Sequence, residues 1–168
     1  HTFVDGRDIR NIEAAIQPNT SLLFLESPNS LTFELQDLSA CAQLAMRHGL
    51  VTAIDNSYSS PLFQRPIELG IDISVHTGTK YLNGHSDIVA GVIAGSLERV
   101  EAARHLLNHL GGSLDPNSCF LLERGLKTLG LRARQHNASA MALARALNAH
   151  PAIASVHYPG LPGSPGHE

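Results

Sequence analysis

The sequence contains only two cysteines and no long apolar run. The first shortage argues against a protein held together by disulfides or zinc, and the second argues against a membrane-spanning protein. Cys41 and Cys119 lie far apart and form no CxxC pattern, so neither a disulfide framework nor a structural zinc site is expected. No apolar stretch approaches the ~20 residues that cross a bilayer, and no basic and then apolar leader opens the chain. We therefore expect a reduced, cytoplasmic protein with no membrane partner.

Charged residues are also scarce. They make up 16% of the chain, the net charge is −3 and no basic run occurs, which argues against nucleic acid as a partner. Neither GxGxxG nor GxxxxGK[ST] is present, so nucleotide binding has no support. His105 and His109 would share a helix face, but no glutamate follows His105 as in HExxH and no third ligand is evident, so we expect no metal site.

What the chain does contain is an alternation of strand and helix patterns. Apolar spacing of three and four residues predicts helices over residues 8–16, 35–47, 97–110 and 132–149 and a further helical region from Asp115-Pro116. Short apolar runs predict strands over residues 21–26, 50–54, 72–75, 88–95 and 153–158. Strand, helix and strand with short links imply right-handed βαβ units. The expected fold class is α/β, with a mainly parallel sheet and flanking helices.

The apolar runs also predict what is buried. The unbroken run at 22–25 suits a parallel strand covered on both faces, and we expect 88–95 to be buried as well. In the helical region after Pro116, the expected core residues are Phe120, Leu121, Leu122, Leu126 and Leu129.

The stretch from Ser74 to Asp87, SVHTGTKYLNGHSD, contains the candidate reactive residue Lys80. A lysine amine forms a Schiff base with an aldehyde cofactor, the hydroxyls of Thr77 and Thr79 can bind a phosphate, and Gly78 permits close backbone approach. These groups together describe a pocket for pyridoxal phosphate. The alternative is a polar turn between two strands with Lys80 in water.

Topology brings a second candidate, Asp55, to the same place. Asp55 ends the strand expected at 50–54, and the Lys80 stretch follows the next strand. Ligands of parallel sheets gather at the carboxyl ends of the strands, so we expect the two to meet at one edge. Asp55 could instead cap a turn through the amides that follow it.

Four segments resemble motifs of the Cys/Met-metabolism family of pyridoxal-phosphate enzymes, in the family's order. They are Phe24–Pro28, Ala53–Pro61, the Lys80 stretch and Arg124–Asn137, and the similarity runs from Phe3 to the end of the chain. The resemblance implies a fold-type I large domain with pyridoxal 5'-phosphate held by Lys80, Asp55, Thr77 and Thr79. In that family a lysine is the catalytic base and an aspartate keeps the pyridine nitrogen protonated.

One departure selects a subgroup. Much of the family has an asparagine where this chain has Ser30, and that serine, together with the LPGS run at 161–164, resembles the bacterial cystathionine β-lyase branch. The resemblance therefore implies β-elimination of cystathionine to homocysteine, pyruvate and ammonia, with Ser30 as a substrate contact. The open alternatives are a cystathionine γ-synthase or O-acylhomoserine sulfhydrylase, or a non-catalytic fragment of such an enzyme.

The resemblance also bears on organisation, because members of the family are more than twice as long as this chain. We expect an internal fragment in which residues 1–135 belong to the cofactor-binding large domain and residues 136–168 form a linking helix and the start of a small C-terminal domain. The expected partners are a small sulfur amino acid and further copies of the full-length protein, as a dimer or tetramer.

Overall fold

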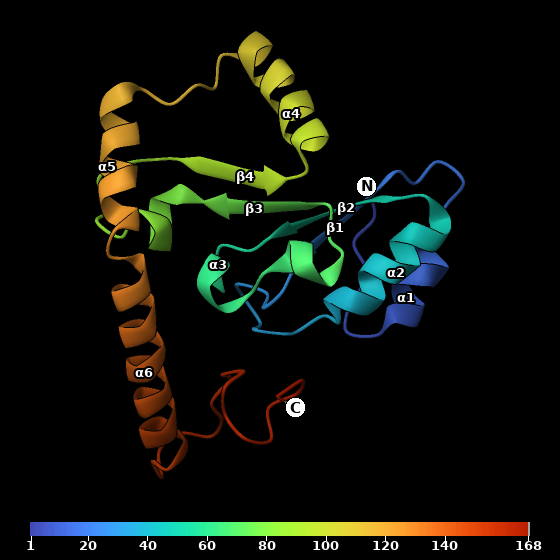
Figure 1. Cartoon of the computed structure of the whole chain (residues 1–168). Helices are drawn as coiled ribbons and strands as arrows, with labels where there is room; N and C mark the ends of the chain where they lie inside the picture. Colours follow the sequence, from blue (N-terminus) through green and yellow to red (C-terminus); the bar gives the residue numbers. More distant parts are fainter. Residues whose placement is uncertain (168) are drawn as a thin grey trace.

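Four strands form a sheet at the centre of the computed structural model, which describes residues 1–167 (Figure 1). The spatial order is that of the sequence: β1 (Leu22–Glu26), β2 (Val51–Asp55), β3 (Ile73–Thr77) and β4 (Gly91–Gly95). The first three strands are parallel, and β4 pairs antiparallel with β3. The predicted α/β class with a mainly parallel sheet is confirmed.

Six α-helices accompany the sheet within residues 1–167. They are α1 (Ile9–Ala15), α2 (Leu38–His48), α3 (Ser60–Phe63), α4 (Leu97–Leu110), α5 (Pro116–Leu126) and α6 (Leu129–Asn148). The helices predicted at 8–16 and 97–110 are confirmed. The helix predicted from Leu35 begins three residues later, because the Asp37 side chain accepts a hydrogen bond from the amide of Ala40 and caps the first turn.

The hydrophobic core lies between the sheet and α1 and α2, which sit together on one side of it (Figure 1). Leu25 of β1 and Ile54 of β2 point into this core, where they pack with Leu38, Cys41 and Leu44 of α2. Gly49 ends α2 in the left-handed conformation at φ +66°, as its position in the sequence predicts.

The opposite face of the sheet is uncovered at the edge strands β1 and β4, so the prediction that the run at 22–25 is covered on both faces is wrong. Leu22 is 50% exposed and Phe24 59% exposed, whereas Leu25, the residue after Phe24, is buried. The run is continuous in sequence, but its alternate side chains point to opposite faces, and at the edge strand β1 only one of the two faces is packed.

Three further predictions are wrong. The strand predicted at 88–95 begins only at Gly91, because the preceding residue, Ala90, bonds to Gly78 and Thr79 instead. It is mostly exposed, because β4 lies at an edge of the sheet. Phe120 and Leu126 of α5 are 61% and 44% exposed. No strand forms at 153–158, where the chain pairs with no neighbouring strand within residues 1–167.

Candidate active site

A cavity of about 540 Å³ opens at the edge of the sheet where β1, β2 and β3 end. All five residues singled out in the sequence line it: Ser30, Asp55, Thr77, Thr79 and Lys80. The other lining residues are Glu26, Ser57, Tyr58, Tyr81, Gly84, Ser86 and His136. The convergence of Asp55 with the Lys80 stretch, expected from topology alone, is therefore present in the structure.

Asp55 and Thr77 are joined through Ser57. The amide of Ser57 donates to Oδ1 of Asp55 at 2.9 Å, and the amide of Thr77 donates to Oγ of Ser57 at 2.6 Å. The turn-capping role considered for Asp55 is thus real, but it uses one oxygen of a carboxylate that also faces the cavity. Ser57 links the ends of β2 and β3 and so fixes the spacing of these groups.

The hydroxyl of Thr79 is partly engaged by the protein itself. Its Oγ1 accepts a hydrogen bond from the amide of Ala90 at 3.1 Å. Gly78 lies against the same residue, because a side chain at Gly78 would start 2.8 Å from Cβ of Ala90. The close approach that Gly78 permits is thus to the strand beside it, and it holds the Lys80 turn against β4.

Lys80 lies in the short turn Gly78–Leu82 directly after β3, and its backbone leaves helical geometry at φ −91°, ψ −114°. The side chain is exposed, and within residues 1–167 it makes no ion pair. The chain has one other lysine, Lys127, whose ammonium group lies 3.7 Å from Glu123 on the surface of α5 and its C-terminus. Lys80 is thus the lysine whose amine is available at a cavity.

Several lining residues have no strong signal in the sequence. His136 reaches the cavity from α6, and its ring lies 5.7 Å from that of Tyr81. It belongs to the segment Arg124–Asn137, but only the packing of α6 against the Lys80 turn brings it here. Glu26 ends β1 and accepts from the amide of Ser30 at 3.3 Å, which places Ser30 at the rim of the cavity. His76, beside Lys80 in sequence, is buried and does not line the cavity.

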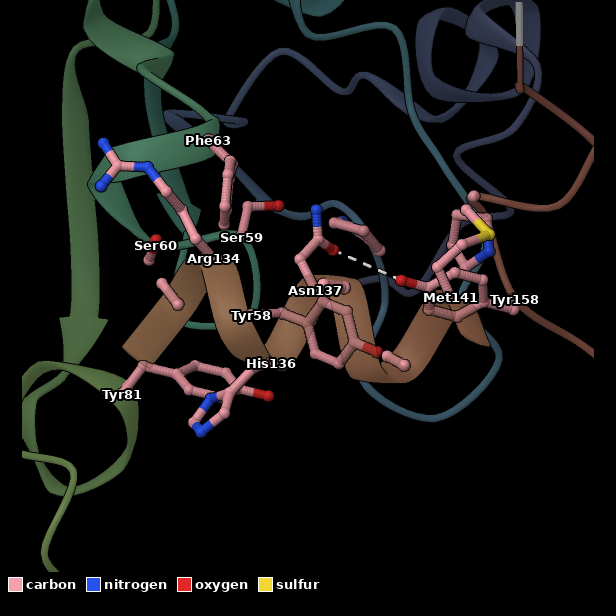
Figure 2. A pocket seen from close by; sticks show the side chains of 16 residues that line it. Tyr58, Ser59, Ser60, Phe63, Tyr81, Arg134, His136, Asn137, Met141 and Tyr158 are labelled. Carbon is pink, nitrogen blue, oxygen red and sulfur yellow. Dashed lines mark hydrogen bonds between the residues drawn. The ribbon is translucent and has the colours of Figure 1, made fainter. Parts of the chain in front are cut away.

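A second cavity, of about 650 Å³, adjoins the first (Figure 2). Tyr58, Tyr81 and His136 line both cavities and form the wall between them. The second cavity lies along α6, and at its far end Tyr158 donates a hydrogen bond to Asn137 at 3.3 Å, drawn as a dashed line in Figure 2. The two cavities form one cleft divided by aromatic rings.

The donor set suits an aromatic aldehyde with a phosphate group. A free amine, a carboxylate and three hydroxyls, those of Ser57, Thr77 and Thr79, face a space of the size that binds small cofactors. An amine can hold an aldehyde, a carboxylate can hold a protonated ring nitrogen and hydroxyls can donate to phosphate oxygens. Fold and site together define an α/β domain with a cavity suited to such a cofactor.

Comparison with known proteins gives the family. The model of the family described as Cys/Met metabolism PLP-dependent enzyme matches residues 1–168. The chain belongs to this family, whose cofactor is pyridoxal phosphate. It is 43% identical to human cystathionine γ-lyase and 42% identical to the chloroplastic cystathionine γ-synthase of Arabidopsis thaliana, over 99% of its length. The cystathionine γ-lyase structure from Lactobacillus plantarum, complexed with L-serine, superposes with a TM-score of 0.90 at 40% identity, over 98% of this chain.

The chain spans only part of these relatives: 42% of the human enzyme, 30% of the plant enzyme and 43% of the bacterial structure. The helices within residues 1–167 include none long and apolar enough to cross a membrane. The rings of His105 and His109 meet edge-on, with 4.7 Å between their centroids. In the described part of the chain no three potential ligands gather around a metal position.

Proposed function

We propose that this chain carries the pyridoxal-phosphate site of an enzyme that acts on the carbon–sulfur bond of a small sulfur amino acid. The observation that carries the proposal is the meeting of Lys80, Asp55, Thr77 and Thr79 around one cavity, in a chain of this family. Cytoplasmic localisation and assembly of the full-length protein into a dimer or tetramer stay predictions.

Each residue has a definite task in the proposal. When bound, pyridoxal phosphate supplies an aldehyde that condenses with amines and a ring that accepts electrons. Lys80 would hold the aldehyde through Nζ and, once freed, would take up the proton from Cα of the substrate. Asp55 would keep a proton on the ring nitrogen, and the hydroxyls of Thr77 and Thr79 would donate to the phosphate.

The substrate could be cleaved at the bond between sulfur and Cβ or at the bond between sulfur and Cγ. The β-elimination predicted from Ser30 and the 161–164 run has weak support, because Leu161 is buried and Ser164 bonds to the carbonyl of Tyr158, and neither lines the cavity. Ser30 remains a proposed substrate contact at the rim. Relatives at 41–43% identity are named γ-lyases and a γ-synthase, which favours attack at Cγ over attack at Cβ.

The first experiment uses the two lysines of the chain as target and control. The protein is incubated with pyridoxal phosphate, reduced with borohydride and mapped by peptide mass spectrometry. We expect the reduced adduct on Lys80 in the wild type and in Lys127→Ala, and its loss in Lys80→Ala together with the visible absorption band. Equal labelling of Lys80, Lys127 and the N-terminal amine would contradict the proposal.

A product assay then distinguishes the reactions. Cystathionine cleaved at Cγ gives cysteine, 2-oxobutyrate and ammonia, whereas cleavage at Cβ gives homocysteine, pyruvate and ammonia. We expect 2-oxobutyrate from the cofactor-loaded protein. Formation of pyruvate would instead indicate β-elimination, as in a cystathionine β-lyase. Labelling of Lys80 without any product would favour the non-catalytic alternative.

A further inference from the structure

The guanidinium of Arg132, on α6, is bound to the backbone of the turn that carries Lys80. Its Nη1 donates to the carbonyl of Tyr81 at 2.7 Å, and its Nη2 lies 3.3 Å from the carbonyl of Leu82 and 2.8 Å from that of Gly125. Its Nε donates to Oγ1 of Thr128 at 2.9 Å. Arg132 forms no ion pair with any carboxylate that the structure describes. The bonds to Tyr81 and Leu82 therefore join α6 to the residues directly after Lys80, and those to Gly125 and Thr128 hold the guanidinium at the junction between α5 and α6.

Two glycines make this contact possible. A side chain at Gly84 would overlap the guanidinium of Arg132, and φ at Gly84 is +78°, a conformation that other residues rarely adopt. A side chain at Gly125 would overlap the backbone of Asn83. The turn and the junction between α5 and α6 thus approach at backbone distance on both sides of Arg132.

A second set of bonds holds the same segment. Asn83 is fully buried, and its Nδ2 donates to Oδ1 of Asp87 at 2.7 Å. Arg124, from α5, lies 3.3 Å from the other oxygen of Asp87. The residues before Lys80 are held by β3 and by Ala90, and the residues after it by α5 and α6. Lys80 stands between the two anchors.

We propose that Arg132 is the positioning residue for Lys80, and this inference rests on the proposed function. The long lysine side chain has no bond of its own in the described structure, so its direction is set by the backbone from which it leaves. By fixing the carbonyls of Tyr81 and Leu82, Arg132 fixes that direction and turns Nζ toward the cavity. A purely architectural role would join α6 to the domain without changing the reactivity of Lys80.

The test measures the reactivity of Lys80 against that of Lys127 in the same molecule. Wild type, Arg132→Ala, Arg132→Lys and Gly84→Ala are incubated briefly with pyridoxal phosphate and reduced, and the ratio of adduct on Lys80 to adduct on Lys127 is determined. We expect that ratio to fall by about ten-fold or more in Arg132→Ala and Gly84→Ala. Methylguanidinium added to Arg132→Ala should restore part of it. The control is Arg145→Ala, an exposed arginine on the same helix.

A second readout needs no cofactor and shows whether the turn is loosened. Amide hydrogen exchange in the peptide that covers residues 78–87 should become about ten-fold faster in Arg132→Ala and remain unchanged in Arg145→Ala. Faster exchange with an unchanged labelling ratio would overturn the inference and leave Arg132 an architectural role. An unchanged ratio in folded Gly84→Ala would overturn it as well. Absence of any preference for Lys80 in the wild type would instead contradict the proposed function itself, and with it the task assigned to Arg132.

Discussion

Lys80 and Lys127 have the same chemistry and different surroundings. Lys127 follows α5 and lies near Glu123, with which it forms a surface ion pair at 3.7 Å. Such pairs contribute little to stability, and they leave the amine fully hydrated. Lys80 lies beside hydroxyls and a carboxylate at the edge of a sheet. The identity of a residue does not make it reactive, but its place at the carboxyl ends of the strands gives it neighbours that can hold a cofactor.

His76 is the buried titratable residue closest in sequence to Lys80. It is 5% exposed, its Nε2 lies 3.1 Å from Oγ of Ser74, and its Nδ1 has no hydrogen-bond partner in the described structure. Burial lowers the pKa of His76 below its ordinary value of 6.5, although the nearby Asp55 carboxylate opposes the shift. The folded protein therefore favours the neutral imidazole.

This burial predicts a pH dependence of stability. Below about pH 6.5 the unfolded chain binds a proton at His76 that the folded chain resists, so the free energy of unfolding should fall as the pH drops from about 7.5 to about 5.5. Urea unfolding at both pH values should show a smaller fall in His76→Gln than in the wild type. The exposed His157 provides the control, and a change as large in His157→Gln would contradict the assignment.

At the scale of elements, α2 covers the core and depends on its two ends. Its last turn is closed by Gly49, and its first by the bond from the amide of Ala40 to Oδ1 of Asp37 at 2.9 Å. We expect Asp37→Ala to lower the free energy of unfolding by about 0.5–2 kcal/mol, because a helix amide loses its acceptor. Asp37→Ser keeps an acceptor and should cost less. Denaturant titration measures both, and equal losses would show that the cap is not the cause.

The ends of the strands explain why the site could be predicted before the fold was known. Asp55 is the last residue of β2, and Thr77 is the last residue of β3. Each follows an apolar run whose length is visible in the sequence, and parallel pairing then brings both to one edge. His136 could not be placed in this way, since its position depends on the packing of α6 against the Lys80 turn, which no local pattern records.

At the scale of the whole molecule, one face of the sheet is packed and the other is open at the edge strands β1 and β4. Leu25 is 3% exposed on the packed face, whereas Phe24 and Ile93 are 59% and 47% exposed. We expect the double variant Phe24→Thr, Ile93→Thr to bind less of a hydrophobic dye and to change the free energy of unfolding only within about 0.5 kcal/mol. Leu25→Ala should lower that free energy by about 2–5 kcal/mol. Similar losses in both variants would mean that the open face is packed in solution.

The division of the chain into residues 1–135 and 136–168 stays a prediction. Both sides of that boundary lie within α6, which runs without interruption from Leu129 to Asn148. The helix contacts the Lys80 turn near its start and lines the second cavity further along. A helix that belongs to the site at one end and continues beyond the sheet is suited to link two domains, and Figure 1 shows it extending away from the strands.

The sequence by itself determined the α/β class, the family, the cofactor and the five residues around the cavity, because these depend on local periodicity and on motifs close to strand ends. Only the tertiary structure decided that one face of the run at 22–25 is open, that Phe120 is exposed and that residues 153–158 form no strand. It also decided the bonds of Arg132 to the Lys80 turn, across about fifty residues of chain. The physical reason is that an apolar or polar pattern fixes what a segment can bury or bind, whereas the partner that it meets depends on how distant segments pack.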